Sequence, residues 1–149
     1  MYNQLYDYLV QNKILYKKQF GFQNKHSTDH AVIQLTDEIL KSFDQNLFTL
    51  GVFIDLSKAF DTVDHNILIK KLELENNNLK FFKSYLSDRK QGASFKNTYS
   101  QLTPIVCGVP QGSILGPLLF LIYVNDWYLS SKFLHFILFA DDTNLFFSY

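Results

Sequence analysis

The stretch FLHFILFADDTNLFFSY, residues 133–149, places two adjacent carboxylates between two apolar runs. Residues 133–140 and 143–149 are rich in aromatic and aliphatic side chains that favour β-strands, and only Asp141 and Asp142 separate them. This pattern predicts two antiparallel strands joined by a two-residue acidic turn. An aspartate pair at a turn is commonly only a turn former, so the pair alone indicates no function.

A third aspartate follows another apolar run. Residues 48–56 begin with FTLGVFI, which predicts a strand buried on both faces, and Asp55 stands at its exit. A carboxylate in such a place is costly unless it is paired or binds a cation. Adjacent antiparallel strands could bring Asp55, Asp141 and Asp142 together, and three oxygen ligands of this kind suit two Mg²⁺ ions.

The apolar spacing elsewhere is mostly helical. The predicted helices run from Met1 to about Leu15, from Thr28 through Phe43, from Phe60 to Asn76–Asn78, over Leu79–Leu86, and after the loop at residues 108–113. Ser27 or Thr28 can cap the second helix. Pro117 is tolerated only in the first turn of the last helix. Residues 87–92 predict a turn, and residues 93–106 a β-hairpin.

Composition limits the class of protein. The chain has 149 residues, 47% of them hydrophobic, which suffices for one domain with a core. Its net charge is zero, whereas a free-standing nucleic-acid-binding domain usually carries a basic excess. Either the chain is not such a domain, or the basic surface lies in other parts of a longer protein. The single Cys107 excludes an internal disulfide, and the apolar stretch 114–124 is too short to span a bilayer, so we expect no membrane partner.

Four motifs occur in order along the chain. They are QFGF at residues 19–22 with His26-Ser27-Thr28, FIDLSKAFDTV at 53–63, GVPQGSILGPLLF at 108–120, and FADD at 139–142. Together they resemble the reverse transcriptases of non-LTR (LINE-type) retrotransposons over nearly the whole chain. The resemblance implies an α+β fold: a right-hand polymerase palm with part of the fingers, in which helices back an antiparallel sheet.

By this resemblance the chain is a partial reverse transcriptase domain, truncated at both ends. Residues 1–47 would belong to the fingers and residues 48–149 mostly to the palm, and the thumb would be absent. The activity would be RNA-directed DNA polymerisation. Asp55, Asp141 and Asp142 would be the catalytic ligands of two Mg²⁺ ions, with Mn²⁺ as a substitute.

The implied partners are an RNA template, a DNA primer, a deoxynucleoside triphosphate (dNTP), and the missing fingers and thumb segments of a parent polyprotein. The family leads us to expect a place in the cytoplasm or nucleus. The isolated chain is expected to be inactive, because the parts that grip the primer and template would be missing.

Five further residues belong to the implied nucleotide site. Phe60 would lie under the sugar and favour deoxynucleotides, although a core phenylalanine explains it as well. Gln111 would touch the nucleotide beside the template, and Gly112 would let the backbone approach closely. Lys58 and Ala59 lie on the stretch whose backbone would run along the triphosphate, although a solvated lysine explains Lys58 about as well.

One residue departs from the family pattern. Gln23 stands where many relatives carry an arginine that can meet the triphosphate, and glutamine cannot neutralise phosphate charge. Either Lys25 or another finger residue substitutes, or nucleotide binding is impaired. The alternative function is therefore a non-catalytic, degenerate remnant of a retrotransposon polymerase. A palm-like nucleotide cyclase or another two-metal phosphotransferase would leave Phe60 and the 110–112 loop without a role.

Overall fold

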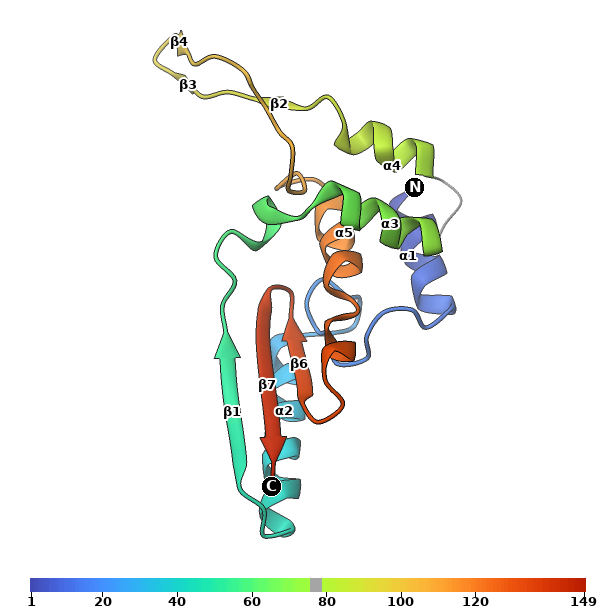
Figure 1. Cartoon of the computed structure of the whole chain (residues 1–149), viewed down its shortest axis with the longest axis vertical. Helices are drawn as coiled ribbons and strands as arrows, with labels where there is room; N and C mark the ends of the chain where they lie inside the picture. Colours follow the sequence, from blue (N-terminus) through green and yellow to red (C-terminus); the bar gives the residue numbers. More distant parts are fainter. Residues whose placement is uncertain (76–78) are drawn as a thin grey trace. The chain divides into compact units, whose positions relative to one another are not determined.

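The computed structural model describes residues 1–75 and 79–149, in which helices combine with short antiparallel sheets (Figure 1). The helices are α1 (Tyr2–Gln11), α2 (Thr28–Asp44), α3 (His65–Glu75), α4 (Leu79–Leu86) and α5 (Leu115–Val124), with 3-10 turns at η1 (Ala59–Thr62) and η2 (Trp127–Ser130). The strands are β1 (Thr49–Ile54), β2 (Lys90–Gln91), β3 (Ser94–Phe95), β4 (Thr98–Tyr99), β5 (Thr103–Pro104), β6 (His135–Phe139) and β7 (Asp142–Ser148). This confirms the predicted mixture of helices and antiparallel sheet; its division into palm and fingers stays a prediction.

Two compact units divide the chain. The first unit contains Met1–Ser57 and Val124–Tyr149, and the second contains Lys58–Tyr123. Of the helices in the residues that the structure describes, none is both long enough and apolar enough to cross a membrane. Asn76–Asn78, where the sequence predicted the end of the third helix, lie outside the described residues.

The first unit is built on a three-stranded antiparallel sheet with the order β1-β7-β6. The predicted hairpin of the two C-terminal apolar runs is confirmed as β6 and β7. Helix α2 lies along one face of this sheet (Figure 1), where Ala31 and Leu35 pack against a core of Phe20, Ile137 and Phe146. The predicted cap of α2 is also confirmed, because the Ser27 side chain accepts a hydrogen bond from the backbone N–H of His30.

The turn between β6 and β7 differs from the prediction by one residue. Phe139 pairs with Asp142, so the two central turn residues are Ala140 and Asp141, not Asp141 and Asp142. Ala140 has a φ of 56°, the sign that the first position of a two-residue hairpin turn requires. Asp142 therefore belongs to strand β7, and its side chain lies on a face of the sheet instead of at the tip.

The burial predicted for β1 is wrong. Thr49 is half-buried and the other residues of the strand are exposed, including Phe53 at 68%. The run has the composition of an inner strand, but within the described chain its only strand partner is β7, so it lies at the edge of the sheet. Local composition cannot reveal how many neighbours a strand will have.

Helix α1 is shorter than predicted. It ends at Gln11, and Lys13 then adopts a φ of 54°, a left-handed conformation that cannot continue a helix. Leu5 and Leu9 form its buried side, as the spacing predicted. The hydroxyl of Tyr6 accepts a hydrogen bond from the backbone N–H of Asn24 and so joins α1 to the loop before α2.

The second unit holds η1, α3, α4, two two-stranded antiparallel sheets (β2 with β5, and β3 with β4) and most of α5. The helix predicted to follow Phe60 begins later, at His65, because Ala59–Thr62 form a 3-10 turn and the Asp64 carboxylate caps the helix. The predicted turn at 87–92 is shorter, since strand β2 already begins at Lys90. The hairpin predicted within residues 93–106 is confirmed by the pairing of β3 with β4, and Pro117 lies in the first turn of α5.

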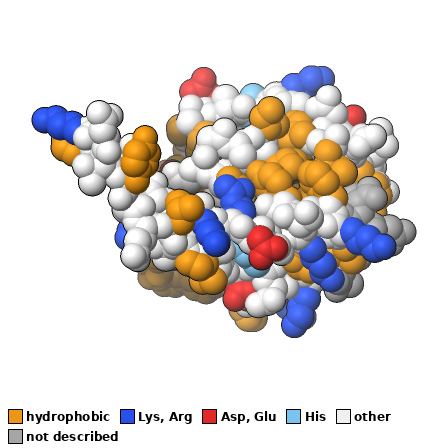
Figure 2. Space-filling model, turned by 90° about the horizontal axis from the view of Figure 1, so that it is seen from above, with side chains coloured by type: hydrophobic (Ala, Val, Ile, Leu, Met, Phe, Trp, Pro, Cys, Tyr) orange, Lys and Arg blue, Asp and Glu red, His pale blue; other side chains and the backbone are white. Residues whose placement is uncertain are grey.

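On the face drawn in Figure 2, lysine and arginine side chains are scattered among apolar and acidic ones. This distribution agrees with the zero net charge of the chain. Several large apolar side chains of the β3–β4 arm are exposed, among them Phe95 at 73% and Tyr99 at 77%.

Candidate active site

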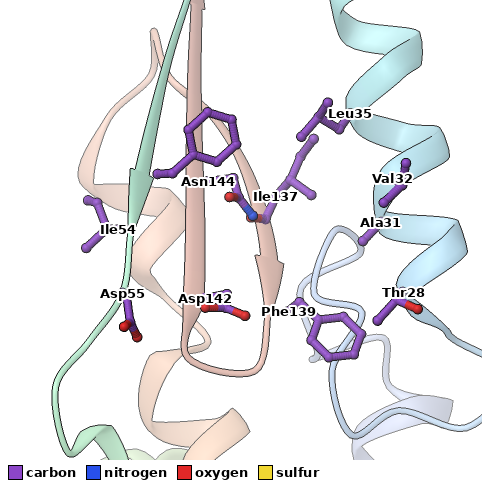
Figure 3. Close-up of a pocket in the computed structure, with 11 residues that line it drawn as sticks. Thr28, Ala31, Val32, Leu35, Ile54, Asp55, Ile137, Phe139, Asp142 and Asn144 are labelled. Carbon is purple, nitrogen blue, oxygen red and sulfur yellow. The ribbon is translucent and has the colours of Figure 1, made fainter.

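Two of the three predicted aspartates come together at neighbouring strand ends. Asp55 directly follows β1, whose last residue Ile54 pairs with Thr143 of β7, and Asp142 begins β7. As a result both carboxylates line one cavity of about 430 Å³ (Figure 3). The rest of its lining comes from α2 and the sheet: Thr28, Ala31, Val32, Leu35, Phe53, Ile54, Ile137, Phe139 and Asn144.

The chemistry of this cavity is that of a small acidic site with mostly apolar walls. Asp55 and Asp142 are both exposed, so a hydrated cation can reach their oxygens. Thr28 and Asn144 add polar side chains to the same lining. Carboxylate, amide and hydroxyl oxygens are hard ligands of the kind that Mg²⁺ prefers.

Asp141 takes a different place, as the second central residue of the hairpin turn. Its backbone carbonyl accepts a hydrogen bond from the Thr143 hydroxyl at 3.3 Å. In residues 1–75 and 79–149, no group of three or more His, Cys, Asp or Glu side chains is arranged to hold a metal ion. The convergence of all three aspartates therefore stays a prediction, and the pair Asp55 and Asp142 is what the structure brings together.

The QFGF motif lies beside the acidic hairpin. Lys18 and Phe20 exchange backbone hydrogen bonds of 2.8 Å with Leu138 of β6, so this segment adds a short parallel bridge to the sheet. Sequence reasoning used the motif only to recognise the family and assigned it no contact with the acidic turn.

Gln23, the departure from the family pattern, has a local partner. Its side chain is half-buried, and Nε2 donates a 2.7 Å hydrogen bond to the backbone carbonyl of Gln19. This glutamine therefore secures the QFGF segment. Lys25 is exposed and lines a separate cavity of about 330 Å³ with His26 and His30, so its role as a substitute stays a prediction.

In the second unit, the predicted nucleotide residues fall into one cluster. The backbone N–H groups of Gly108 and Val109 donate to the carbonyls of Val63 and Phe60 at 2.7 and 2.8 Å. These bonds fasten the 108–113 loop to the segment that follows Asp55 in sequence. Beyond them, Gln111 Nε2 donates a 2.8 Å hydrogen bond to Asp61 Oδ1.

The two glycines of this loop, Gly108 and Gly112, differ in why glycine is favoured at each position. Gly108 has a φ of +86°, and a Cβ there would lie 2.8 Å from the carbonyl oxygen of Asp61, so close backbone contact requires glycine. Gly112 has a φ of +79°, and a Cβ there would meet nothing within 4 Å. The positive φ alone therefore favours glycine there, and the close approach of a ligand to its backbone stays a prediction.

Phe60 combines a packing role with partial exposure. Its ring stacks on Phe120 with centroids 4.3 Å apart, and its side chain is only half-buried. Ala59 beside it is 7% exposed, so it supports the turn more than it offers a contact. Lys58 is exposed, and it precedes η1 as the N-cap residue with a φ of 54°.

Sequence reasoning missed two cations beside this cluster. Arg89 and Lys90 line a cavity of about 660 Å³ together with Lys58, Asp61 and Gln111. The motif at residues 87–92 was interpreted only as a turn. The signal in the sequence was that Arg89 and Lys90 are adjacent, in a chain whose net charge is zero.

Comparisons with known proteins agree with the motifs. A family model described as reverse transcriptase (RNA-dependent DNA polymerase) matches residues 1–149. The chain is 41% identical over 132 residues to the probable RNA-directed DNA polymerase from transposon BS of Drosophila melanogaster, covering 83% of the chain and 14% of that protein. It is 36% identical over 110 residues to the probable RNA-directed DNA polymerase from transposon X-element of the same organism, covering 72% and 12%.

A third relative is the RNA-directed DNA polymerase from mobile element jockey of Drosophila melanogaster. It is 34% identical over 116 residues, which cover 76% of the chain and 13% of that protein. The chain thus spans only 12–14% of the length of these three relatives.

Proposed function

Because the chain belongs to the reverse transcriptase family, among the polymerases of non-LTR retrotransposons, we propose that it carries the acidic centre of an RNA-directed DNA polymerase. In this reaction the 3′-hydroxyl of a DNA primer attacks the α-phosphate of a dNTP, the hydroxyl loses its proton, and pyrophosphate leaves. The observation that carries the proposal is the pairing of β1 with β7, which places Asp55 and Asp142 on one cavity.

Reverse transcriptases generally use divalent metal ions, and the donor set fits one. Asp55 and Asp142 would hold Mg²⁺ through carboxylate oxygens, with Asp141 as the third ligand, and we propose two ions, for which Mn²⁺ can substitute. When bound, such ions lower the pKa of the attacking hydroxyl and stabilise the charge on the leaving phosphate. The protein would contribute to this chemistry by holding the carboxylates at the ends of paired strands.

The second cluster would bind the nucleotide. Gln111 is already oriented by Asp61, so it would meet the base pair without first losing the freedom of a mobile side chain. Lys58, Arg89 and Lys90 supply positive charge to one cavity, which suits phosphate groups. The exposed part of the Phe60 ring would exclude a 2′-hydroxyl and so favour deoxynucleotides, while Ala59 and Gly112 would present backbone.

A binding experiment tests the acidic centre. Mn²⁺ binding to the chain is measured by electron paramagnetic resonance, for the wild type and for Asp55→Asn and Asp142→Asn, with Asp37→Asn on the exposed side of α2 as a matched control. The proposal expects each site variant to weaken binding at least tenfold, and the control to bind like the wild type. Equal Mn²⁺ binding by all four proteins would refute the proposed metal centre.

The non-catalytic remnant is the second candidate, and the local partner of Gln23 favours it. A glutamine that is bonded to its own segment leaves the usual arginine role unfilled. Primer extension on an RNA template, measured for the chain and for any longer reading frame that contains it, separates the two candidates. Mn²⁺ binding without extension by the longest frame would favour the remnant.

A further inference from the structure

One buried polar side chain contacts the acidic turn directly. Gln19 is 3% exposed, and its Oε1 accepts hydrogen bonds from the backbone N–H groups of Ala140 at 2.9 Å and Gly21 at 2.8 Å. Its Nε2 donates to the Ala140 carbonyl at 3.2 Å. A single amide therefore satisfies both backbone groups of the residue that precedes Asp141.

The turn needs such support because of the residue at its first central position. Ala140 has a φ of 56°, in the left-handed region that residues with a Cβ rarely adopt and where glycine is the usual choice. It is also buried, so water cannot replace the two hydrogen bonds. Without Gln19, the hairpin would lose the interaction that compensates for this strained backbone.

The backbone around Gln19 is itself fixed by several contacts. The bonds of Lys18 and Phe20 with Leu138 fix the backbone on both sides of it. Gln23 donates to its carbonyl, and the Lys18 ammonium pairs with Glu38 of α2 at 2.7 Å. The amide therefore reaches Ala140 from a rigid base.

From this geometry we infer that Gln19 is a positioning residue for the acidic hairpin, which sets the metal affinity of the aspartates without touching the metal. It holds Ala140 in the conformation that places Asp141 in the turn and begins β7 at Asp142. The inference rests on the proposed function, because it assumes that these aspartates bind a divalent cation.

The test replaces Gln19 by methionine, which keeps the length of the side chain and removes its hydrogen bonds. Mn²⁺ affinity is measured on the whole chain by electron paramagnetic resonance, and the exchange rate of the Ala140 amide proton by NMR. We expect Gln19→Met to weaken Mn²⁺ binding about tenfold or more, the size typical of residues that orient metal ligands through hydrogen bonds. The Ala140 amide should exchange faster, while the exposed control Gln11→Met should change neither.

A rescue variant separates positioning from general stability. In Gln19→Met/Ala140→Gly the turn residue tolerates a positive φ unaided, so Mn²⁺ affinity should return most of the way to the wild-type value. If Gln19→Met does not fold, Gln19→Glu retains the acceptor for the two N–H groups and lacks only the donor to the Ala140 carbonyl. It should bind Mn²⁺ more weakly than the wild type despite its added negative charge.

Two results would overturn the inference: wild-type Mn²⁺ affinity in folded Gln19→Met or in Gln19→Glu, or a loss that Ala140→Gly does not reverse at all. Failure of the proposed function looks different. In that case Asp55→Asn and Asp142→Asn bind Mn²⁺ like the wild type, whatever the Gln19 variants do.

Discussion

The contact between Gly21 and the acidic turn makes Gly21→Ala a severe substitution. An added Cβ would lie 2.2 Å from the backbone nitrogen of Ala140 and 2.8 Å from its Cα, far inside van der Waals contact. These are backbone atoms of a hairpin, so no flexible side chain can move aside. Overpacking of this kind costs about 1–3 kcal/mol, and displacement of the segment would also weaken the hydrogen bond from Gly21 to Gln19, which contributes about 1 kcal/mol.

We therefore expect Gly21→Ala to lower the free energy of unfolding by about 2–4 kcal/mol, which corresponds to a fall in Tm of roughly 5–15 °C. Gly51→Ala is the matched control, because it lies in the same unit and its Cβ would meet the Phe146 ring, a side-chain neighbour, at 3.1 Å. That control should change stability by less than about 1 kcal/mol. Urea unfolding followed by circular dichroism measures both variants. Equal stabilities for Gly21→Ala and Gly51→Ala would refute the reasoning.

Three other predictions follow from individual contacts. Burial by itself would raise the pKa of Glu38, but the hydrogen bond from Lys18 and the charges of Lys18, His135 and Lys41 outweigh it, so the pKa is lowered. The ionised Glu38 carboxylate therefore stabilises the fold at pH values above its ordinary pKa. This stabilisation is lost as the pH falls through the pKa of the folded state. Urea midpoints between pH 6 and pH 3 should therefore fall less steeply for Glu38→Gln than for the wild type. The exposed hydrogen bond between Gln111 and Asp61 should show a coupling of about 0.5–1 kcal/mol in a double-mutant cycle of alanine variants, measured by urea unfolding, and zero coupling would contradict it. Phe60→Ala removes the stack on Phe120 and should lower stability by about 1–3 kcal/mol; in an active longer frame it should also reduce the preference for deoxynucleotides, measured by competition between dNTPs and ribonucleotides.

Features set by local sequence could be predicted. The cap of α2 at Ser27, the position of Pro117 in the first turn of α5 and the C-terminal hairpin each depend on residues within a few positions of one another. The motifs also singled out Asp55 and Asp142, which the structure places on one cavity, while their catalytic role stays a prediction.

Features set by distant contacts could not be predicted. The sequence favoured Asp141-Asp142 as the turn because aspartate tolerates turns better than alanine does. The positive φ of Ala140 is instead accompanied by two hydrogen bonds with the side chain of Gln19, one donated and one accepted by its amide, although this residue is 121 positions away in sequence. In the same way, the burial of β1 depends on neighbours that its own composition cannot specify.

The exposed edge of β1 also bears on how the chain behaves in concentrated solution. The run FTLGVFI contains neither proline nor charge, and one side of the strand has no strand neighbour among the described residues. Natural sheets usually protect such edges with lysine, proline or a bulge, because an open apolar edge can pair with the same strand of another molecule. Self-association through β1, leading toward cross-β aggregates, is therefore the hazard that this fold carries when the chain is handled alone. A single lysine at an outward position such as Val52 is the remedy that the strand geometry suggests.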